Sequence, residues 1–176
     1  MLILKLETVT PLFLAGADPR GAPELRAASV RGALRYWLRA LLGGALGDQN
    51  LDALREAEAA VFGSTDNASP VVVRIRDSYP QIESFSELAE KRPGISYLFF
   101  AARGTRNEPE RSAIKAGSLF ELVLSKRVGL EEAGDQALHR AYAALWLLTH
   151  LGGLGARSRR GAGNLQVAQV SGKIPN

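Results

Sequence analysis

The stretch from Leu151 to Leu165 combines residue types that could hold an anion. It reads LGGLGARSRRGAGNL and carries five glycines and three arginines, but no acidic residue. Glycine lets a backbone approach a ligand closely and expose its amide donors. An arginine guanidinium can donate two parallel hydrogen bonds to a phosphate. The predicted binding residues of this stretch are Gly152, Gly153, Gly155, Arg157, Arg159, Arg160, Gly161 and Gly163.

Two common nucleotide motifs are excluded for this stretch. No Gly-Lys-Ser/Thr follows the glycines, so it is not the phosphate loop of a nucleotide hydrolase. A dinucleotide fingerprint runs from strand to helix, whereas this stretch is expected to run from helix to strand. A polyphosphate backbone such as RNA suits both the glycines and the arginines. The plainer alternative, a helix C-cap followed by a solvated turn, accounts for only one or two of the glycines.

A second group of cations consists of Arg31, Arg35 and Arg39, which recur every four residues. On a helix they form one stripe beside an apolar face. No acidic residue lies between Arg26 and Arg39, so ion pairs within the helix are missing and the like charges repel by a few tenths of a kcal/mol per pair. We expect RNA phosphates to neutralise the stripe; a solvated helix face is the alternative.

Few residues suggest catalysis. His150 adjoins the glycine stretch and could act as a general base, although a histidine at a helix end is common. His139 precedes it by eleven residues, or ~16 Å along a helix, which is too far for a shared metal. Asp18 could position a metal or a ribose hydroxyl, but an aspartate before proline is also a routine turn residue. We therefore predict no catalytic residue, with His150 and Asp18 as the weak candidates.

The hydrophobic pattern predicts the elements that must position these residues. Alternation and 3.6-residue periodicity indicate strands at 2–9, 71–76, 95–102, 119–126 and 164–170, and helices at 30–42, 52–60 and 131–151. Ser29 is the expected N-cap of the first helix, and Gly43-Gly44 its end. The last helix is apolar nearly all round and is expected to be central. Residues 103–112 (RGTRNEPERS) are expected to form an exposed, flexible tip.

Without an insertion around residues 80–117, the order of elements is βαββαβ. This order predicts an α+β, ferredoxin-like fold, with a four-stranded antiparallel sheet and two helices on one face. The chain of 176 residues is long enough for one such domain with an inserted lobe.

Composition narrows the class of protein. The net charge is +4, which by itself favours a nucleic-acid partner only slightly. The chain has no cysteine and two histidines, so we expect no disulfide, no structural zinc and no cofactor. No apolar run reaches the ~18 residues of a membrane helix, and there is no secretory segment. We expect a cytoplasmic protein without a membrane partner.

Several segments in order resemble the RAMP superfamily of CRISPR-associated proteins. They are the opening strand, TPLFLAGAD, ASVRGALRYWLRAL, VFGS, AGSLFELVLS and GGLGARSRRGAGNL, which together span almost the whole chain. Within the superfamily, VRGALRYWLRAL and GGLGARSRRGAG are most similar to segments of the first-numbered subunits of type III-B (Cmr) effector complexes. Those subunits usually carry two such domains, whereas residues 1–176 are expected to form one.

The resemblance implies a ferredoxin-like (RRM-like) fold and a place in an RNA-guided antiviral ribonucleoprotein. The implied partners are CRISPR guide RNA, target RNA, or both, and other type III effector subunits. The arginine stripe and the glycine-arginine stretch match the family's RNA-contacting regions. The resemblance also implies a subunit that does not cut RNA. Slicing subunits use an aspartate in a loop broadly comparable to that of Asp18, but this likeness alone does not transfer the activity.

Two alternatives remain open at this stage. Related RAMP proteins cleave precursor guide RNA without metal, and His150 beside GGLG would then be the general base. In the second alternative, the arginines meet acidic protein surfaces and the subunit is purely structural.

Overall fold

The computed structural model describes residues 1–47 and 49–172. Its elements are β1 (Leu2–Thr8), α1 (Ala27–Leu46), α2 (Leu51–Phe62), β2 (Val71–Arg76), β3 (Ile82–Ser84), α3 (Phe85–Lys91), α4 (Gly94–Leu98), β4 (Ser112–Ile114), β5 (Leu119–Lys126), α5 (Glu131–Leu151) and β6 (Leu165–Gly172). Two 3₁₀ turns, η1 (Phe100–Ala102) and η2 (Ser158–Arg160), complete them. None of the helices in these residues is long and apolar enough to cross a membrane.

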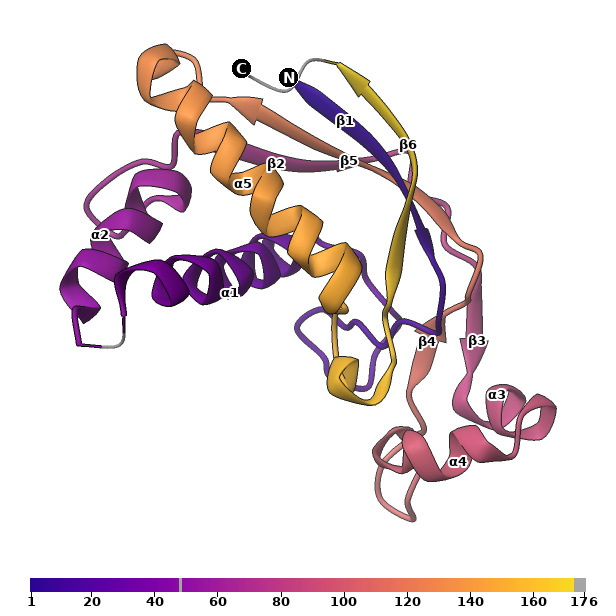
Figure 1. Cartoon of the computed structure of the whole chain (residues 1–176). Helices are drawn as coiled ribbons and strands as arrows, with labels where there is room; N and C mark the ends of the chain where they lie inside the picture. The colour runs from indigo at the N-terminus through magenta and orange to yellow at the C-terminus, as the bar shows by residue number, and fades with distance from the viewer. Residues whose placement is uncertain (48, 173–176) are drawn as a thin grey trace.

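The main sheet has the strand order β2-β5-β1-β6. Each neighbouring pair is antiparallel, with Leu4 opposite Leu122 on one side of β1 and opposite Val170 on the other. In this order the first and third strands of the βαββαβ core are central and the second and fourth are edges. The predicted ferredoxin-like fold is therefore confirmed (Figure 1).

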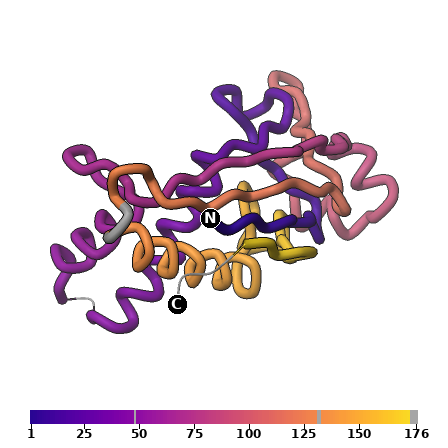
Figure 2. Tube along the Cα trace, turned by 90° about the horizontal axis from the view of Figure 1, so that it is seen from above, coloured from indigo at the N-terminus to yellow at the C-terminus, as the bar shows by residue number. Residues whose placement is uncertain are grey.

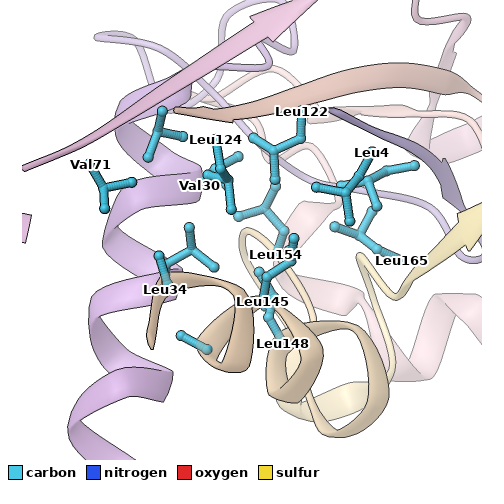
Figure 3. Close-up of a cluster of buried hydrophobic side chains, with 14 of the residues drawn as sticks. Leu4, Val30, Leu34, Val71, Leu122, Leu124, Leu145, Leu148, Leu154 and Leu165 are labelled. Carbon is cyan, nitrogen blue, oxygen red and sulfur yellow. The ribbon is translucent and has the colours of Figure 1, made fainter. Parts of the chain in front are cut away.

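The core lies between this sheet and α1 and α5. Leu2, Leu4 and Leu6 alternate inward along β1, as their spacing predicts, and each is at most 1% exposed. Leu34 of α1 and Leu145 of α5 meet these strands from the helix layer (Figure 3). Viewed from above, α2 and α5 lie on the same side of the strands (Figure 2). Helices α1 and α5 thus cover one face of the sheet.

Helix α1 is longer at both ends than the sequence predicts. It begins at Ala27 rather than after Ser29, and its N-cap, Arg26, makes no side-chain capping bond. Gly43 and Gly44 lie inside the helix because each costs only about 1 kcal/mol there. The helix ends instead where Gly47 takes a φ of +79° and donates its N–H to the Gly43 carbonyl.

Helix α5 has the predicted bounds, but it is buried on one face only. Its buried residues, among them Ala141 and Leu148, share the face that meets the sheet. Trp146 is half exposed and His150 is exposed, and at 100° per residue both lie on the opposite face. The helix is therefore a cover over the sheet rather than a fully enclosed central element.

Residues 82–114 form a lobe between β2 and β5, which projects beyond the end of the sheet remote from the start of β1 (Figure 1). The predicted strand at 95–102 is wrong, since these residues lie within α4 and η1. An unbroken apolar run of this length does not distinguish a strand from a helix. Phe99 and Ala102 enter a second buried cluster, whereas Tyr97 and Phe100 remain exposed.

The tip of the lobe is exposed but held in place. Arg20, from the loop after β1, donates hydrogen bonds from Nη1 to the carbonyls of Arg103 (3.2 Å) and Pro109 (2.9 Å). Its Nη2 pairs with the Glu108 carboxylate at 2.5 Å. The tip is exposed, as predicted, and Arg20, more than eighty positions away in the chain, also holds it by hydrogen bonds.

The course of α1 through its glycines leads to a first prediction. A Cβ at Gly44 would meet nothing within 4 Å. Gly44→Ala should therefore raise the free energy of unfolding by about 0.5–1 kcal/mol, because it stiffens the unfolded chain and favours helix. Urea unfolding followed by circular dichroism measures this change. A loss of stability instead would place the end of the helix at Gly43, where the sequence alone puts it.

Candidate nucleic-acid interface

The loop after α5 is bound along its length to the loop after β1. The Ala156 N–H donates to the Phe13 carbonyl at 2.8 Å, and the Gly163 N–H donates to the Pro11 carbonyl at 2.9 Å. Asn164 adds a bond from its N–H to Thr10 Oγ1 at 2.9 Å and one from Nδ2 to the Gly152 carbonyl at 3.1 Å. The glycine-arginine stretch is therefore an ordered part of the fold.

Most of its glycines are required by close packing within the protein. A Cβ at Gly155 would lie 2.5 Å from the Phe13 carbonyl oxygen, and one at Gly163 only 1.9 Å from that of Leu154. Both residues have a positive φ, +82° and +68° respectively. A Cβ at Gly152 would lie 2.5 Å from Nε1 of Trp37. The sequence predicts approach to a ligand, but at these positions the close approach is to the chain itself.

The three arginines of the loop have different surroundings. Arg157 is half-buried with a φ of +63°, and its guanidinium lies 5.2 Å from the centre of the Phe100 ring. Arg159 and Arg160, in η2, are exposed, and neither forms an ion pair with any residue that the structure describes. These two arginines are thus the loop cations open to an external anion.

Arg157 also belongs to a cluster that the sequence does not bring together. Arg20, Arg111 and Arg157, here called the basic junction, meet where the two loops join the lobe. Burial lowers the pKa of Arg111, and the positive charges of Arg20 and Arg157 lower it further. Among the described residues, Glu108 is the one carboxylate that pairs with this cluster. The junction therefore holds an excess of positive charge beside η2.

Sequence reasoning did not single out Arg20 or Arg111 as site residues. The sequence offered one weak indication: Arg111 is the last residue of one of the three arginine-rich segments of the chain. Only the folded loops bring the three side chains together.

The arginine stripe of α1 is largely accounted for inside the protein. Glu58 of α2 is 4% exposed, and its carboxylate accepts hydrogen bonds from Arg35 Nε and from Arg39 Nη1, the latter at 2.9 Å. Ion pairs within α1 are missing, as the sequence indicates, but a carboxylate from the neighbouring helix pairs with two of the three arginines. Helical periodicity relates only residues of the same helix. It could not reveal this contact, because Glu58 belongs to α2 and the arginines belong to α1. Arg31 has no such partner among the described residues.

The stripe and the loop lie on opposite flanks of α1. Arg31 and Arg35 line a shallow surface hollow with Val73 of β2. Ala33, Tyr36 and Trp37 face the glycine loop instead. At 100° per residue, Tyr36 and Arg35 point in clearly different directions. The structure therefore does not join the two predicted RNA-binding groups into one surface.

The weak catalytic candidates make local contacts. His150 Nδ1 lies 2.8 Å from the Trp146 carbonyl, and its ring stacks on that of Trp146 with centroids 4.2 Å apart. Asp18 Oδ1 accepts the Arg20 N–H at 2.9 Å, as in a turn. The described residues contain no group of three or more acidic, histidine or cysteine side chains that could hold a metal ion. Neither candidate has acquired a catalytic partner among the residues that the structure describes.

Comparison with known proteins gives a consistent result. A family model described as the RAMP superfamily matches residues 5–166. Two curated relatives come from Pyrococcus furiosus. CRISPR system Cmr subunit Cmr1-2 is 39% identical over 180 residues, which cover 96% of this chain and 95% of that protein. CRISPR system Cmr subunit Cmr1-1 is 33% identical over 171 residues, which cover 97% of this chain but 48% of that protein.

Solved structures share the fold. The crystal structure of apo Cmr1 from Pyrococcus furiosus has a TM-score of 0.76 and 31% identity, over 98% of this chain and 50% of that one. A chain of the Type III-B Cmr-beta complex bound to cognate target RNA and AMPPnP has a TM-score of 0.72 at 15% identity, over 98% of this chain and 56% of that one. The chain thus spans one curated relative almost entirely and about half of the longer proteins.

The Glu58 contacts lead to a second prediction. Replacing Arg35 and Arg39 together by alanine leaves the buried Glu58 carboxylate without a partner, which should cost about 3–5 kcal/mol of unfolding free energy. Thermal and urea unfolding measure this cost. Arg31→Ala is the matched control, one turn earlier on the same stripe, and should change stability by less than about 0.5 kcal/mol. Equal stability of the double variant and the control would contradict the structural role of Glu58.

Proposed function

Because this chain belongs to the RAMP superfamily, we propose that it is a non-catalytic RNA-binding subunit of a type III-B CRISPR effector complex. Its relatives support this assignment, since both curated proteins are named as Cmr subunits and one of them aligns from end to end. The partners would be guide RNA, target RNA, or both, together with other effector subunits of an antiviral complex. We further propose that residues 1–176 form one RAMP domain with an insertion around residues 80–117.

The observation that carries the RNA-binding role is the unneutralised charge around η2. Arg159 and Arg160 are exposed and unpaired within the described chain, and the basic junction lies next to them with a single carboxylate partner. Such an arrangement is costly in self-repulsion unless an anion lies nearby. A nucleic-acid backbone supplies one negative charge per nucleotide and would run from the junction across η2.

The loop's packing favours this role as well. Its backbone is hydrogen-bonded to residues 11 and 13, so the arginines project from a fixed support. A preorganised support reduces the entropy cost of binding a flexible RNA strand. Contacts of this type read phosphate rather than base sequence. Sequence recognition would then come from pairing between guide and target, as in other RNA-guided effectors.

The predicted residues carry unequal weight in this proposal. We retain Arg159 and Arg160 as phosphate contacts, Arg157 as part of the basic junction, and Arg31 as a separate exposed cation. Arg35 and Arg39 have partly exposed side chains, but one donor of each already bonds the Glu58 carboxylate, which balances part of their charge. The glycines Gly152, Gly153, Gly155, Gly161 and Gly163 would contribute by shaping the loop.

Salt dependence tests the phosphate contacts. Replacing Arg159 and Arg160 by alanine should weaken binding to single-stranded RNA and reduce the slope of log affinity against log salt by about 1.4, or about 0.7 for each phosphate that an arginine no longer neutralises. Fluorescence anisotropy over a series of salt concentrations measures the slope. Arg157 is left intact, because its contact with Phe100 also supports the lobe.

The matched control is Arg55→Ala. Arg55 is an exposed arginine of α2 that pairs with Asp52 at 3.2 Å, on an element remote from the glycine loop (Figure 1). Its replacement should leave the slope unchanged. An unchanged slope in the Arg159/Arg160 variant as well would remove the loop from the RNA interface and favour the alternative in which the arginines meet acidic protein surfaces.

The non-catalytic part of the proposal has its own test. Incubation with repeat-containing RNA in EDTA should leave the RNA intact, and so should incubation with Mg²⁺. Discrete cleavage in EDTA that His150→Ala abolishes would establish the metal-independent endoribonuclease instead. Metal-dependent cutting that Asp18→Ala abolishes would establish a slicing activity.

A further inference from the structure

A pocket lies between α1 and the loop after α5. Its volume is about 470 Å³, within the range of about 300–1,000 Å³ that is usual for small-ligand sites. Tyr36 and Trp37 line it from α1, Gly152 and Gly153 from the end of α5, and Arg159 from η2. The pocket therefore opens beside one of the two cations assigned above to phosphate contacts.

The α1 wall of the pocket presents an aromatic surface. Tyr36 is 57% exposed and lies on the side of α1 away from its buried residues Val30, Leu34 and Leu38. Its ring stands edge-on to Trp37, with centroids 5.5 Å apart and planes at 86°. More than half of the Tyr36 surface is exposed and therefore available to a flat ligand.

The same pocket holds polar groups without internal partners. Ser29, Trp37 and Ser158 line it. Their side-chain donors have no hydrogen-bond partner among the described residues, and they are not buried, since Ser118 Oγ is the one described side-chain atom that is buried without a partner. Buried or half-buried indole N–H groups usually find an acceptor. Gly152 packs closely against the indole edge at the rim of the pocket, since a Cβ there would lie 2.5 Å from Nε1.

We propose that this pocket binds one nucleobase of the RNA strand that crosses η2. The inference rests on the proposed RNA-binding function and adds the site at which a base, rather than a phosphate, is held. The base would leave the strand's stack and lie against Tyr36, with its edge acceptors toward the Trp37 N–H and the serine hydroxyls. Arg159 would bind the adjoining phosphate.

The chemistry of the pocket favours a base over other ligands. Unstacked bases of single-stranded RNA bind to aromatic side chains through their faces, and their edges carry carbonyl and ring-nitrogen acceptors. The lining supplies one exposed ring, several donors and a cation, and no acidic residue among the described side chains. A cationic or purely apolar ligand would leave the donors unpaired and Arg159 unneutralised.

Tryptophan fluorescence reports directly on the pocket. The chain has two tryptophans, so Trp146→Phe leaves Trp37 as the sole reporter. Single-stranded oligouridine should change the Trp37 emission on binding. An abasic oligonucleotide of the same length and charge should bind through its phosphates yet leave the emission unchanged. A response to both oligonucleotides, or to neither, would overturn the base pocket.

Affinity measurements separate this pocket from the phosphate contacts. Tyr36→Ala should weaken oligouridine binding about tenfold with the salt slope unchanged, because a stacking contact releases no counterion. Tyr36→Phe keeps the ring and should bind as the parent does. Full affinity in Tyr36→Ala would overturn the pocket, while the Arg159/Arg160 slope would still decide the proposed function. Absence of RNA binding by the parent would overturn both.

Discussion

The mutual pairing of two loops supports the rest of this structure. The loop after β1 lies between the lobe and the glycine loop, since Leu12 exchanges backbone hydrogen bonds with Ile114 at 2.9 Å each and Phe13 accepts one from Ala156 at 2.8 Å. Leu12 enters the main core, and Phe13 enters the second core of the lobe. The main hydrophobic core and the core of the lobe are therefore joined through a few residues of the loop after β1. The absence of space for a Cβ at Gly155 follows from this close approach, since the nearest atom is the Phe13 carbonyl oxygen.

This pairing also divides α1 into two flanks with different roles. One flank faces β2 and α2, where the buried Glu58 carboxylate accepts hydrogen bonds from Arg35 and Arg39. The other flank faces the glycine loop, with Trp37 against Gly152 and Tyr36 at the surface. A buried carboxylate requires partners. The paired arginines and the aromatic residues beside the glycine loop thus lie on different flanks of one helix.

The basic junction shows how a site of this kind is assembled from distant segments. Arg20 comes from the first loop, Arg111 from the lobe and Arg157 from the glycine loop, and the charges of Arg20 and Arg157 help to depress the pKa of Arg111. The backbone beside Arg157 is fixed by the hydrogen bond from the Ala156 N–H to the Phe13 carbonyl. The same rigidity places Arg159 beside the pocket that Tyr36 and Trp37 line. The phosphate contacts and the proposed base pocket would consequently act on neighbouring parts of one RNA strand.

The amino-acid sequence by itself determined the order of the principal elements, the inward face of β1 and the bounds of β2, β5 and α5, because alternation and helical periodicity are local properties of the chain. It also located the glycine-arginine loop. It misplaced both ends of α1 and assigned a strand to residues 95–102, where local signals are ambiguous. Only the tertiary structure decided that Glu58 neutralises Arg35 and Arg39, that Arg20, Arg111 and Arg157 form a cluster, and that Trp37 meets Gly152. Each of these contacts joins residues far apart in the chain, so no spacing within a single element could have revealed it.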